Sequence, residues 1–250
     1  MFHVVIPARF GASRLPGKPL LPIGGRPLIQ WVWERACASG AASVIVATDD
    51  ARVLAAAEGF GADCLMTSPG HASGTDRIAE VVRVRGFTAE QIVVNVQGDE
   101  PFIEPELVAR VAEALRVRPY FDLATAVAPI QSQHEFLDAN CVKAVRGLDG
   151  RALYFSRAPV PWPRDSAPLG RPSRWDGAWR HIGIYAYRVR GLLQLAALPP
   201  TPLEKTESLE QLRALEHGMS IHLLELEHSP AGGVDTPEDL ARVRASLQTP

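Results

Sequence analysis

The feature that most constrains this fold is an alternation of short apolar runs with helical patterns along the first half of the chain. The apolar runs are nearly continuous and rich in β-branched residues, which is typical of strands buried on both faces of a sheet. They lie at residues 2–6, 43–47 and 92–96, and the helical patterns lie at 27–38, 50–57 and 75–84. Strand–helix alternation of this kind predicts an α/β fold with a mainly parallel sheet covered by helices on both faces.

Each of the three helical patterns begins at a residue that is typical of helix starts. Pro27 is expected at the first helical position, where its missing N–H is no loss. Asp50 and Thr75 are expected to cap their helices with side-chain oxygens.

The second half of the chain is less regular. Its patterns predict strands at 123–128, 142–145, 181–188 and 221–226, and helices at 209–215 and 237–247. Residues 157–177 are rich in Pro, Arg and Trp, and a long irregular stretch inside a domain is expected to be a binding loop or a subunit contact. No linker-like composition separates the halves, so we predict a single domain over 1–250 with an inserted, partly irregular subregion at about 151–190.

Composition excludes several classes of protein. The formal net charge of -2 in 250 residues argues against a polybasic protein that binds nucleic acid or a membrane surface. No run of about 18 apolar residues occurs, and residues 1–7 are too short and uncharged for a signal peptide. Cys37, Cys64 and Cys141 are an odd, widely spaced set that fits neither a disulfide framework nor a CxxC metal site. We therefore expect a soluble intracellular protein with reduced cysteines.

The loop after the first strand, residues 7–20, carries the strongest signal for a ligand. Open α/β sheets bind ligands at the carboxyl ends of their parallel strands. Gly11 and Gly17 permit close backbone approach, and Ser13, Arg14 and Lys18 offer donors and positive charge to phosphates. The spacing is not that of a Walker loop. The alternative is a surface loop in which the glycines only make turns.

Two acidic residues are candidates for holding a metal. Asp99 follows the strand at 92–96, and Asp235 follows a Gly-Gly pair. Oxygen ligands suit Mg²⁺, which needs few protein carboxylates when phosphates complete its octahedron. The alternatives are an ordinary strand-to-helix turn at Asp99, with Glu100 as a turn or cap residue, and at Asp235 a helix start formed by Thr236, Pro237 and Asp239.

Two further segments could bind a substrate. Small polar residues at 71–77 could meet a base or a phosphate at a helix N-terminus. Arg157 could grip a carboxylate, and Glu207, Glu210 and Gln211 have the spacing of neighbouring positions on one helix. The alternative is a solvated helix face with a structural arginine. No GxSxG, HExxH or GxGxxG pattern supports a hydrolase, a zinc protease or a dinucleotide-binding protein.

Taken in order, these segments resemble a known family. The stretch IPAR-x3-SRLPGKPL at 6–20 is similar to the signature of the sugar nucleotidylyltransferases. Segments 47–50, 73–77, 95–101, 154–157, 181–185 and 233–237 extend the likeness to the 3-deoxy-manno-octulosonate (Kdo) cytidylyltransferases within that family. The likeness runs from residue 4 to about residue 244, and only the variable stretch at 165–179 has no counterpart.

The resemblance implies a three-layer α/β/α sandwich with a mixed, mainly parallel central sheet, of the nucleotide-diphospho-sugar transferase type. It implies a cytoplasmic homodimer without nucleic-acid or membrane partners. The implied reaction moves CMP from CTP to the anomeric 2-hydroxyl of Kdo, releases pyrophosphate and serves lipopolysaccharide biosynthesis.

The resemblance also implies roles for individual residues. Asp99 and Asp235 would hold Mg²⁺, and the triphosphate would be bound by Arg9, Ser13, Arg14 and Lys18, with Lys18 and Arg14 also catalytic. The backbone around Ala8 and at Gly74 and Thr75 would read cytosine, with Gln97 next to both substrates. The sugar acid would be bound by Arg157, His181, Tyr185, Glu210 and Gln211.

Two alternatives to this function stay open at this point. One is a cytidylyltransferase for another acidic sugar, such as a sialic acid or an amino-substituted Kdo. The other is a nucleotide-binding sensor that has lost turnover.

Overall fold

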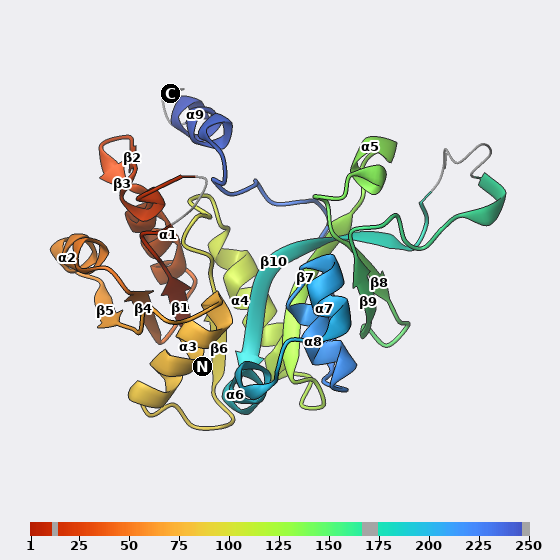
Figure 1. The fold of residues 1–250 in the computed structure, drawn as a ribbon, viewed down its shortest axis with the longest axis horizontal. Helices are drawn as coiled ribbons and strands as arrows, with labels where there is room; N and C mark the ends of the chain where they lie inside the picture. Colours follow the sequence, from red (N-terminus) through yellow and green to blue (C-terminus); the bar gives the residue numbers. More distant parts are fainter. Residues whose placement is uncertain (12–14, 167–174, 247–250) are drawn as a thin grey trace.

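A twisted central sheet organises the molecule (Figure 1). The structure, a computed structural model, describes residues 1–11, 15–166 and 175–246. The strand order is β11-β7-β10-β6-β1-β4-β5, and all of these strands run in one direction except β10. Their bounds are β1 (Phe2–Pro7), β4 (Ser43–Thr48), β5 (Asp63–Met66), β6 (Ile92–Asn95), β7 (Leu123–Pro129), β10 (Ala178–Arg188) and β11 (Ile221–Glu225). The predicted mainly parallel, mixed sheet is confirmed.

Four more strands lie off the main path of the sheet among the described residues. β8 (Lys143–Arg146) pairs with the start of β10 and with β9 (Ala152–Ser156), so the sheet continues beyond its main path. A separate two-stranded sheet joins β2 (Pro22–Ile23) and β3 (Arg26–Pro27). The predicted irregular subregion at 151–190 therefore contains two strands of the central sheet, β9 and β10, besides loop.

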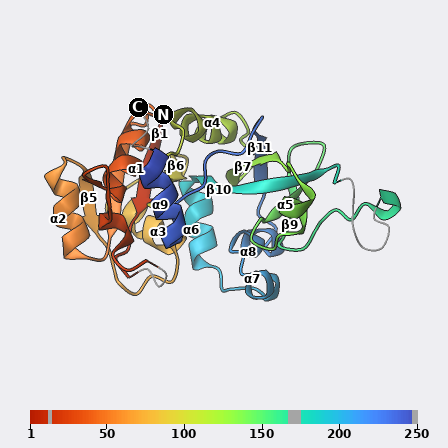
Figure 2. The same cartoon turned by 90° about the horizontal axis from the view of Figure 1, so that it is seen from above.

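Helices cover both faces of the sheet, as the alternation of the sequence requires. In β1, Val4 and Ile6 pack on one side with α1 (Leu28–Cys37) and α4 (Pro105–Arg116), whereas Val5 packs on the other with α3 (Gly74–Val84) and α6 (Val189–Ala197). Seen from above, α4 and α6 lie on opposite sides of β10 (Figure 2). Successive residues of a strand point to opposite faces, so a run that is apolar throughout needs a cover on each face.

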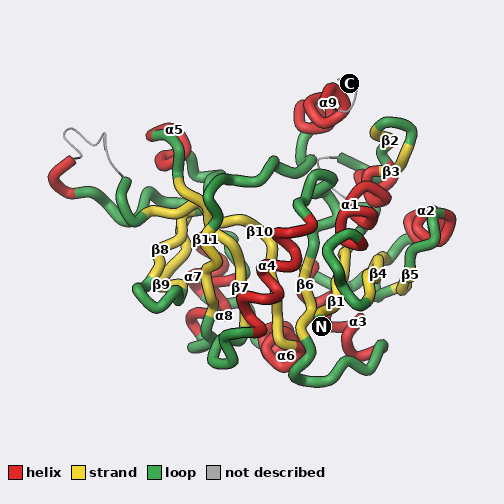
Figure 3. The backbone as a smooth tube through the Cα atoms, turned by 180° about the vertical axis from the view of Figure 1, so that it is seen from behind, coloured by secondary structure: helices red, strands yellow, loops and turns green. Residues whose placement is uncertain are grey.

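The remaining helices lie around this frame. They are α2 (Ala51–Gly59), α5 (Gln133–Leu137), α7 (Pro202–Glu207), α8 (Gln211–Glu216) and α9 (Pro237–Ser246), with 3₁₀ turns η1 (Lys18–Leu20) and η2 (Arg164–Ser166). The chain leaves β11, crosses the molecule as a long loop and ends in α9 beside the β2–β3 turn (Figure 3). Arg244 anchors α9 there by donating to Pro22 O at 2.9 Å. No described helix is both long and apolar enough to cross a bilayer.

Two of the three predicted helix starts are wrong in detail. Pro27 does not occupy the first helical position of α1, because it is held extended by pairing with Pro22 and precedes the helix. Ser73, and not Thr75, caps α3, since Gly74 is already helical and the Ser73 hydroxyl accepts from the Asp76 N–H. The predicted cap at Asp50 is confirmed.

Glu207, Glu210 and Gln211 do not share one helix, although their spacing predicts that they do. Glu207 ends α7, Ser208 adopts a left-handed conformation with φ of 52°, and Gln211 begins α8. The helical pattern therefore breaks between them, and the three side chains have different surroundings.

Candidate functional site

The loops that follow β1 and β6 meet at one edge of the sheet, where the sequence placed the ligand. β1 and β6 are parallel neighbours, so the residues after each strand emerge together. The loop after β6 approaches the end of β1 closely at Gly98. Only glycine allows this approach, because a Cβ at position 98 would lie 2.8 Å from Pro7 O. A cavity of about 280 Å³ opens at this edge, and it is lined by Ala8, Arg9, Lys18, Ser73, Gly74, Arg77, Gln97, Asp99 and Asp235 among others.

The acidic end of the cavity is organised by one lysine. Lys18 Nζ donates to Asp99 Oδ2 at 2.6 Å, to Asp235 Oδ1 at 3.0 Å and to Val234 O at 3.0 Å. Asp99 comes from the loop after β6 and Asp235 from the loop before α9, so the ammonium group ties three distant segments together. Burial lowers the pKa of Lys18, but the Asp99 and Asp235 carboxylates outweigh it, and the pKa lies above its usual value.

The loop before α9 packs tightly over the Asp99 segment. Val234 N donates to Asp99 O at 2.8 Å. A Cβ on Gly233 would lie 2.9 Å from both Asp99 O and Glu100 Oε1, so the close approach requires glycine there. The Gly-Gly pair before Asp235 thus brings that carboxylate to the site, while Thr236 and Asp239 form the predicted capping contacts of α9.

Negative charge exceeds positive charge at this end of the cavity. Burial, followed by the charges of Asp99 and Asp235, raises the pKa of Glu100 to about 7. The described residues hold no group of three or more His, Cys, Asp or Glu side chains placed to bind a metal. Two facing carboxylates with hard oxygen donors nevertheless suit a divalent cation whose remaining ligands are phosphate oxygens. The donor set therefore fits Mg²⁺ in the presence of a nucleotide.

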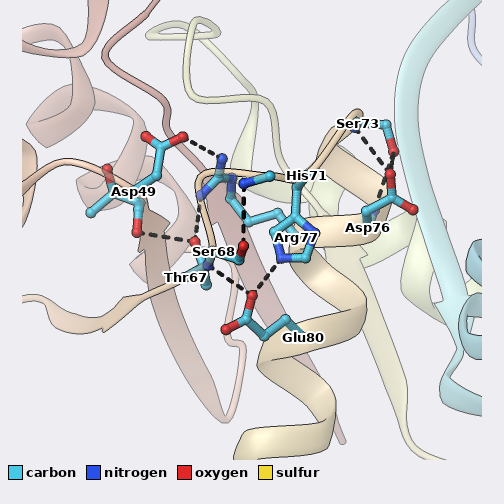
Figure 4. A network of polar contacts seen from close by, with 10 residues as sticks. Asp49, Thr67, Ser68, His71, Ser73, Asp76, Arg77 and Glu80 are labelled. Carbon is cyan, nitrogen blue, oxygen red and sulfur yellow. Dashed lines mark hydrogen bonds and ion pairs between the residues drawn. The ribbon is translucent and has the colours of Figure 1, made fainter.

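A polar network around the start of α3 contributes His71, Ser73 and Arg77 to the cavity wall (Figure 4). Arg77, on the first turns of α3, is 3% exposed, pairs with Asp49 Oδ2 at 2.7 Å and donates to Thr67 Oγ1. His71 pairs with Glu80, whose carboxylate also accepts from Ser68 N at 2.9 Å. These contacts tie α3 to the ends of β4 and β5, so the wall is preorganised.

Two of the residues in this wall were not assigned roles from the sequence. Arg77 and His71 lie in the 71–77 segment, which could meet a base or a phosphate, but neither side chain has a role of its own there. Both line the cavity. The available signal was that Arg77 stands four residues before Val81 and so shares a helix face with an apolar position, where a buried arginine needs a partner.

The structure places the predicted nucleotide-side residues as follows. Ala8, Arg9, Lys18, Gly74 and Gln97 line the cavity, whereas Thr75 is not among the lining residues. Thr75 instead directs its hydroxyl to Glu210 Oε2 at 2.5 Å. Ser13 and Arg14 lie outside the described residues.

The predicted sugar-side residues are more dispersed. A second cavity of about 100 Å³ adjoins the first through Gln97, and it is lined by His181, Glu100 and Arg180 among others. His181 bonds Thr125 Oγ1 at 2.9 Å, and burial lowers the pKa of His181 to about 4. The imidazole is therefore neutral near pH 7 and serves as a hydrogen-bonding group.

The other sugar-side residues line neither of these two cavities. Arg157 donates from Nε to Glu207 O at 2.6 Å and from Nη1 to Ala139 O at 3.0 Å, so part of its guanidinium is committed to backbone carbonyls. Burial raises the pKa of the Tyr185 hydroxyl well above its usual value. Gln211 is buried at the start of α8.

Comparison with known proteins identifies the family. The family model for cytidylyltransferases matches residues 3–221. The chain belongs to the cytidylyltransferase family. A 3-deoxy-manno-octulosonate cytidylyltransferase from Pseudomonas syringae pv. syringae is 50% identical, with 99% of this chain and 98% of the relative covered. One from Halorhodospira halophila is 52% identical, with 99% and 97% covered.

Solved structures give the same result for this cytidylyltransferase. A CMP:2-keto-3-deoxy-manno-octonic acid synthetase complexed with CTP superposes with a TM-score of 0.89 at 43% identity, covering 99% of this chain and 98% of that one. A cytidylyltransferase from Leptospira borgpetersenii shares the fold, with a TM-score of 0.62 at 16% identity over 98% and 86% of the two chains. The predicted family, fold class and enzyme class are confirmed.

Proposed function

We propose that this cytidylyltransferase transfers CMP from CTP to the anomeric 2-hydroxyl of Kdo and releases pyrophosphate, supplying an activated sugar for lipopolysaccharide. The observation that carries the proposal is the cavity in which Lys18, Asp99 and Asp235 meet beside the preorganised wall of α3. The relatives' names and the CTP complex of the structural neighbour support the choice of substrates.

The chemistry of this reaction suits the groups in the cavity. Attack of a sugar hydroxyl on the α-phosphorus is a displacement in which charge develops on phosphate oxygens, so positioning and cationic stabilisation dominate catalysis. Lys18 is held where two carboxylates keep it charged, and its ammonium can neutralise the departing pyrophosphate. Arg9 lines the same cavity and can bind the outer phosphates.

Asp99 and Asp235 are the residues that would hold Mg²⁺. When bound there, the ion would polarise the α-phosphate and lower the pKa of the attacking hydroxyl. The two carboxylates also orient Lys18, and their charge, together with burial, raises the pKa of the neighbouring Glu100 to about 7.

We further propose that the protein acts in the cytoplasm as a homodimer. The family resemblance supports this proposal, and the formal net charge of -2 gives no reason to expect nucleic-acid or membrane partners. Size-exclusion chromatography with light scattering tests the dimer, and a monomeric mass would contradict it.

The experiment that tests the function is pyrophosphate release with CTP and Mg²⁺, with Kdo, a sialic acid and a hexose 1-phosphate offered separately. We expect release with Kdo alone, abolished by EDTA. Release only with another acceptor would overturn the acceptor assignment and keep the nucleotide chemistry. CTP binding without release for any acceptor would favour a sensor.

A further inference from the structure

Thr75 and Glu210 form a link between the two halves of the molecule. Thr75 lies on the first turn of α3 and is 2% exposed, and Glu210 directly precedes α8, 135 residues later. The Thr75 hydroxyl donates to Glu210 Oε2 at 2.5 Å. A hydrogen bond to a carboxylate is among the stronger polar contacts in a protein, and here its donor is buried.

The link acts on the wall of the nucleotide cavity, because Thr75 follows Gly74 directly. Ser73 and Gly74 line that cavity. On one side, this turn is held by the pairing of Arg77 with Asp49 at 2.7 Å. On the other side, Glu210 holds it through Thr75. The cavity wall is thus fixed from both halves of the sheet.

Glu210 is itself held in place within its own half. Arg213, which pairs with Glu204, also lies 3.9 Å from Glu210 Oε1. That oxygen is buried and accepts no hydrogen bond from the described residues. Negative charge near the N-terminus of α3 is also favourable to the helix dipole.

We propose that Glu210 is a positioning residue of the nucleotide site, acting through Thr75 on the turn at Ser73 and Gly74. This inference deepens the proposed function, because it assumes that CTP occupies the cavity. It differs from the role implied by family resemblance, in which Glu210 binds the sugar acid directly.

The test uses Thr75→Val, which keeps the shape of the side chain and removes the donor, and Thr75→Ser, which restores the donor. Kd for CTP is measured by calorimetry without any acceptor, and KM for CTP and for the sugar acid is measured by pyrophosphate release. We expect Thr75→Val and Glu210→Leu, each of which removes one partner of the hydrogen bond, to weaken CTP binding about tenfold, Thr75→Ser to recover most of it, and the double variant to be no worse than either single variant.

The matched control is Ser220→Ala. Ser220 donates a hydroxyl to Asp122 Oδ2 at 2.9 Å between the starts of β7 and β11, the same kind of bond away from the cavity. It should lower stability without changing KM for CTP. If Thr75→Val folds and binds CTP as wild type does, the proposal is overturned. A rise in KM for the sugar acid alone would also overturn it and assign Glu210 to the acceptor. If wild type itself binds no CTP, the proposed function fails instead.

Discussion

Replacing Lys18 by Met tests the central electrostatic argument. Met retains most of the apolar stem and removes the ammonium group that joins Asp99, Asp235 and Val234 O. The Lys18 and Asp99 side chains are 15% and 28% exposed, so the loss of this charged hydrogen bond costs about 2 kcal/mol. Asp235 is 55% exposed, and its contact adds less than about 1 kcal/mol after screening.

The expected result is a fall of about 2 kcal/mol in the free energy of unfolding, measured by urea denaturation. The pKa of Lys18 lies above its usual value, so its contribution is present below about pH 10 and is lost only above the folded-state pKa. The contribution of Lys18 to the free energy of unfolding should therefore be constant between pH 7 and pH 9. In pyrophosphate release, kcat should fall at least about 10²-fold, because a cation facing the developing charge is lost.

Lys205→Met is the matched control, since Lys205 is exposed on α7. It should change stability by less than about 0.5 kcal/mol and leave kcat unchanged. If Lys18→Met were as stable as Lys205→Met, the three contacts would carry no net energy. A kcat near that of wild type would remove Lys18 from the mechanism.

Three further predictions follow from the site. Asp99→Ala or Asp235→Ala should each lower kcat at least about 10²-fold in the pyrophosphate assay, and near-normal turnover would remove that residue from the mechanism. Because the pKa of His181 is lowered to about 4, the unfolded chain, with a pKa of about 6.5, binds a proton more readily than the folded protein does. Lowering the pH from 7 to 5 should therefore reduce the free energy of unfolding by about 2 kcal/mol through this group, as measured by urea denaturation. His181→Gln should lose that component, and an unchanged pH dependence would contradict it. Gly98→Ala should strongly weaken CTP binding in calorimetry because its Cβ would meet Pro7 O at 2.8 Å, whereas Gly59→Ala, with open space around it, should bind CTP as wild type does.

Much of the frame could be predicted because it depends on local pattern. Strands β1, β4, β6, β7, β8, β10 and β11 lie where the apolar runs placed them. The elements that were missed include β5, β9, α4, α6 and α7. β5 has the sequence DCLM, which is only four residues long and contains no β-branched residue. α4 begins with Pro105 at its first position and has buried residues at helical spacing, so its signals were present in the sequence although Glu104 makes no capping hydrogen bond.

The cavity edge was also predictable, because parallel strands deliver their following loops to one side of the sheet. Lys18, Asp99 and Asp235 meet there as expected. What could not be predicted is that a single lysine bridges both carboxylates, since that depends on the path of the chain from β11 to α9. The break at Ser208 between α7 and α8 likewise depends on a backbone conformation that the helical spacing does not reveal.

The sequence by itself determined the layered α/β fold, the edge at which the cavity opens and, through its motifs, the family. These properties follow from periodicity, glycine positions and residue chemistry within short segments. Only the tertiary structure decided the partners of each polar side chain: Thr75 turned to Glu210 instead of capping a helix, and Arg157 was committed to backbone carbonyls. The physical reason is that a polar group removed from water bonds to whichever acceptor folding brings next to it. That acceptor is far away in the sequence: Glu210 is 135 residues from Thr75, and Glu207 is 50 residues from Arg157.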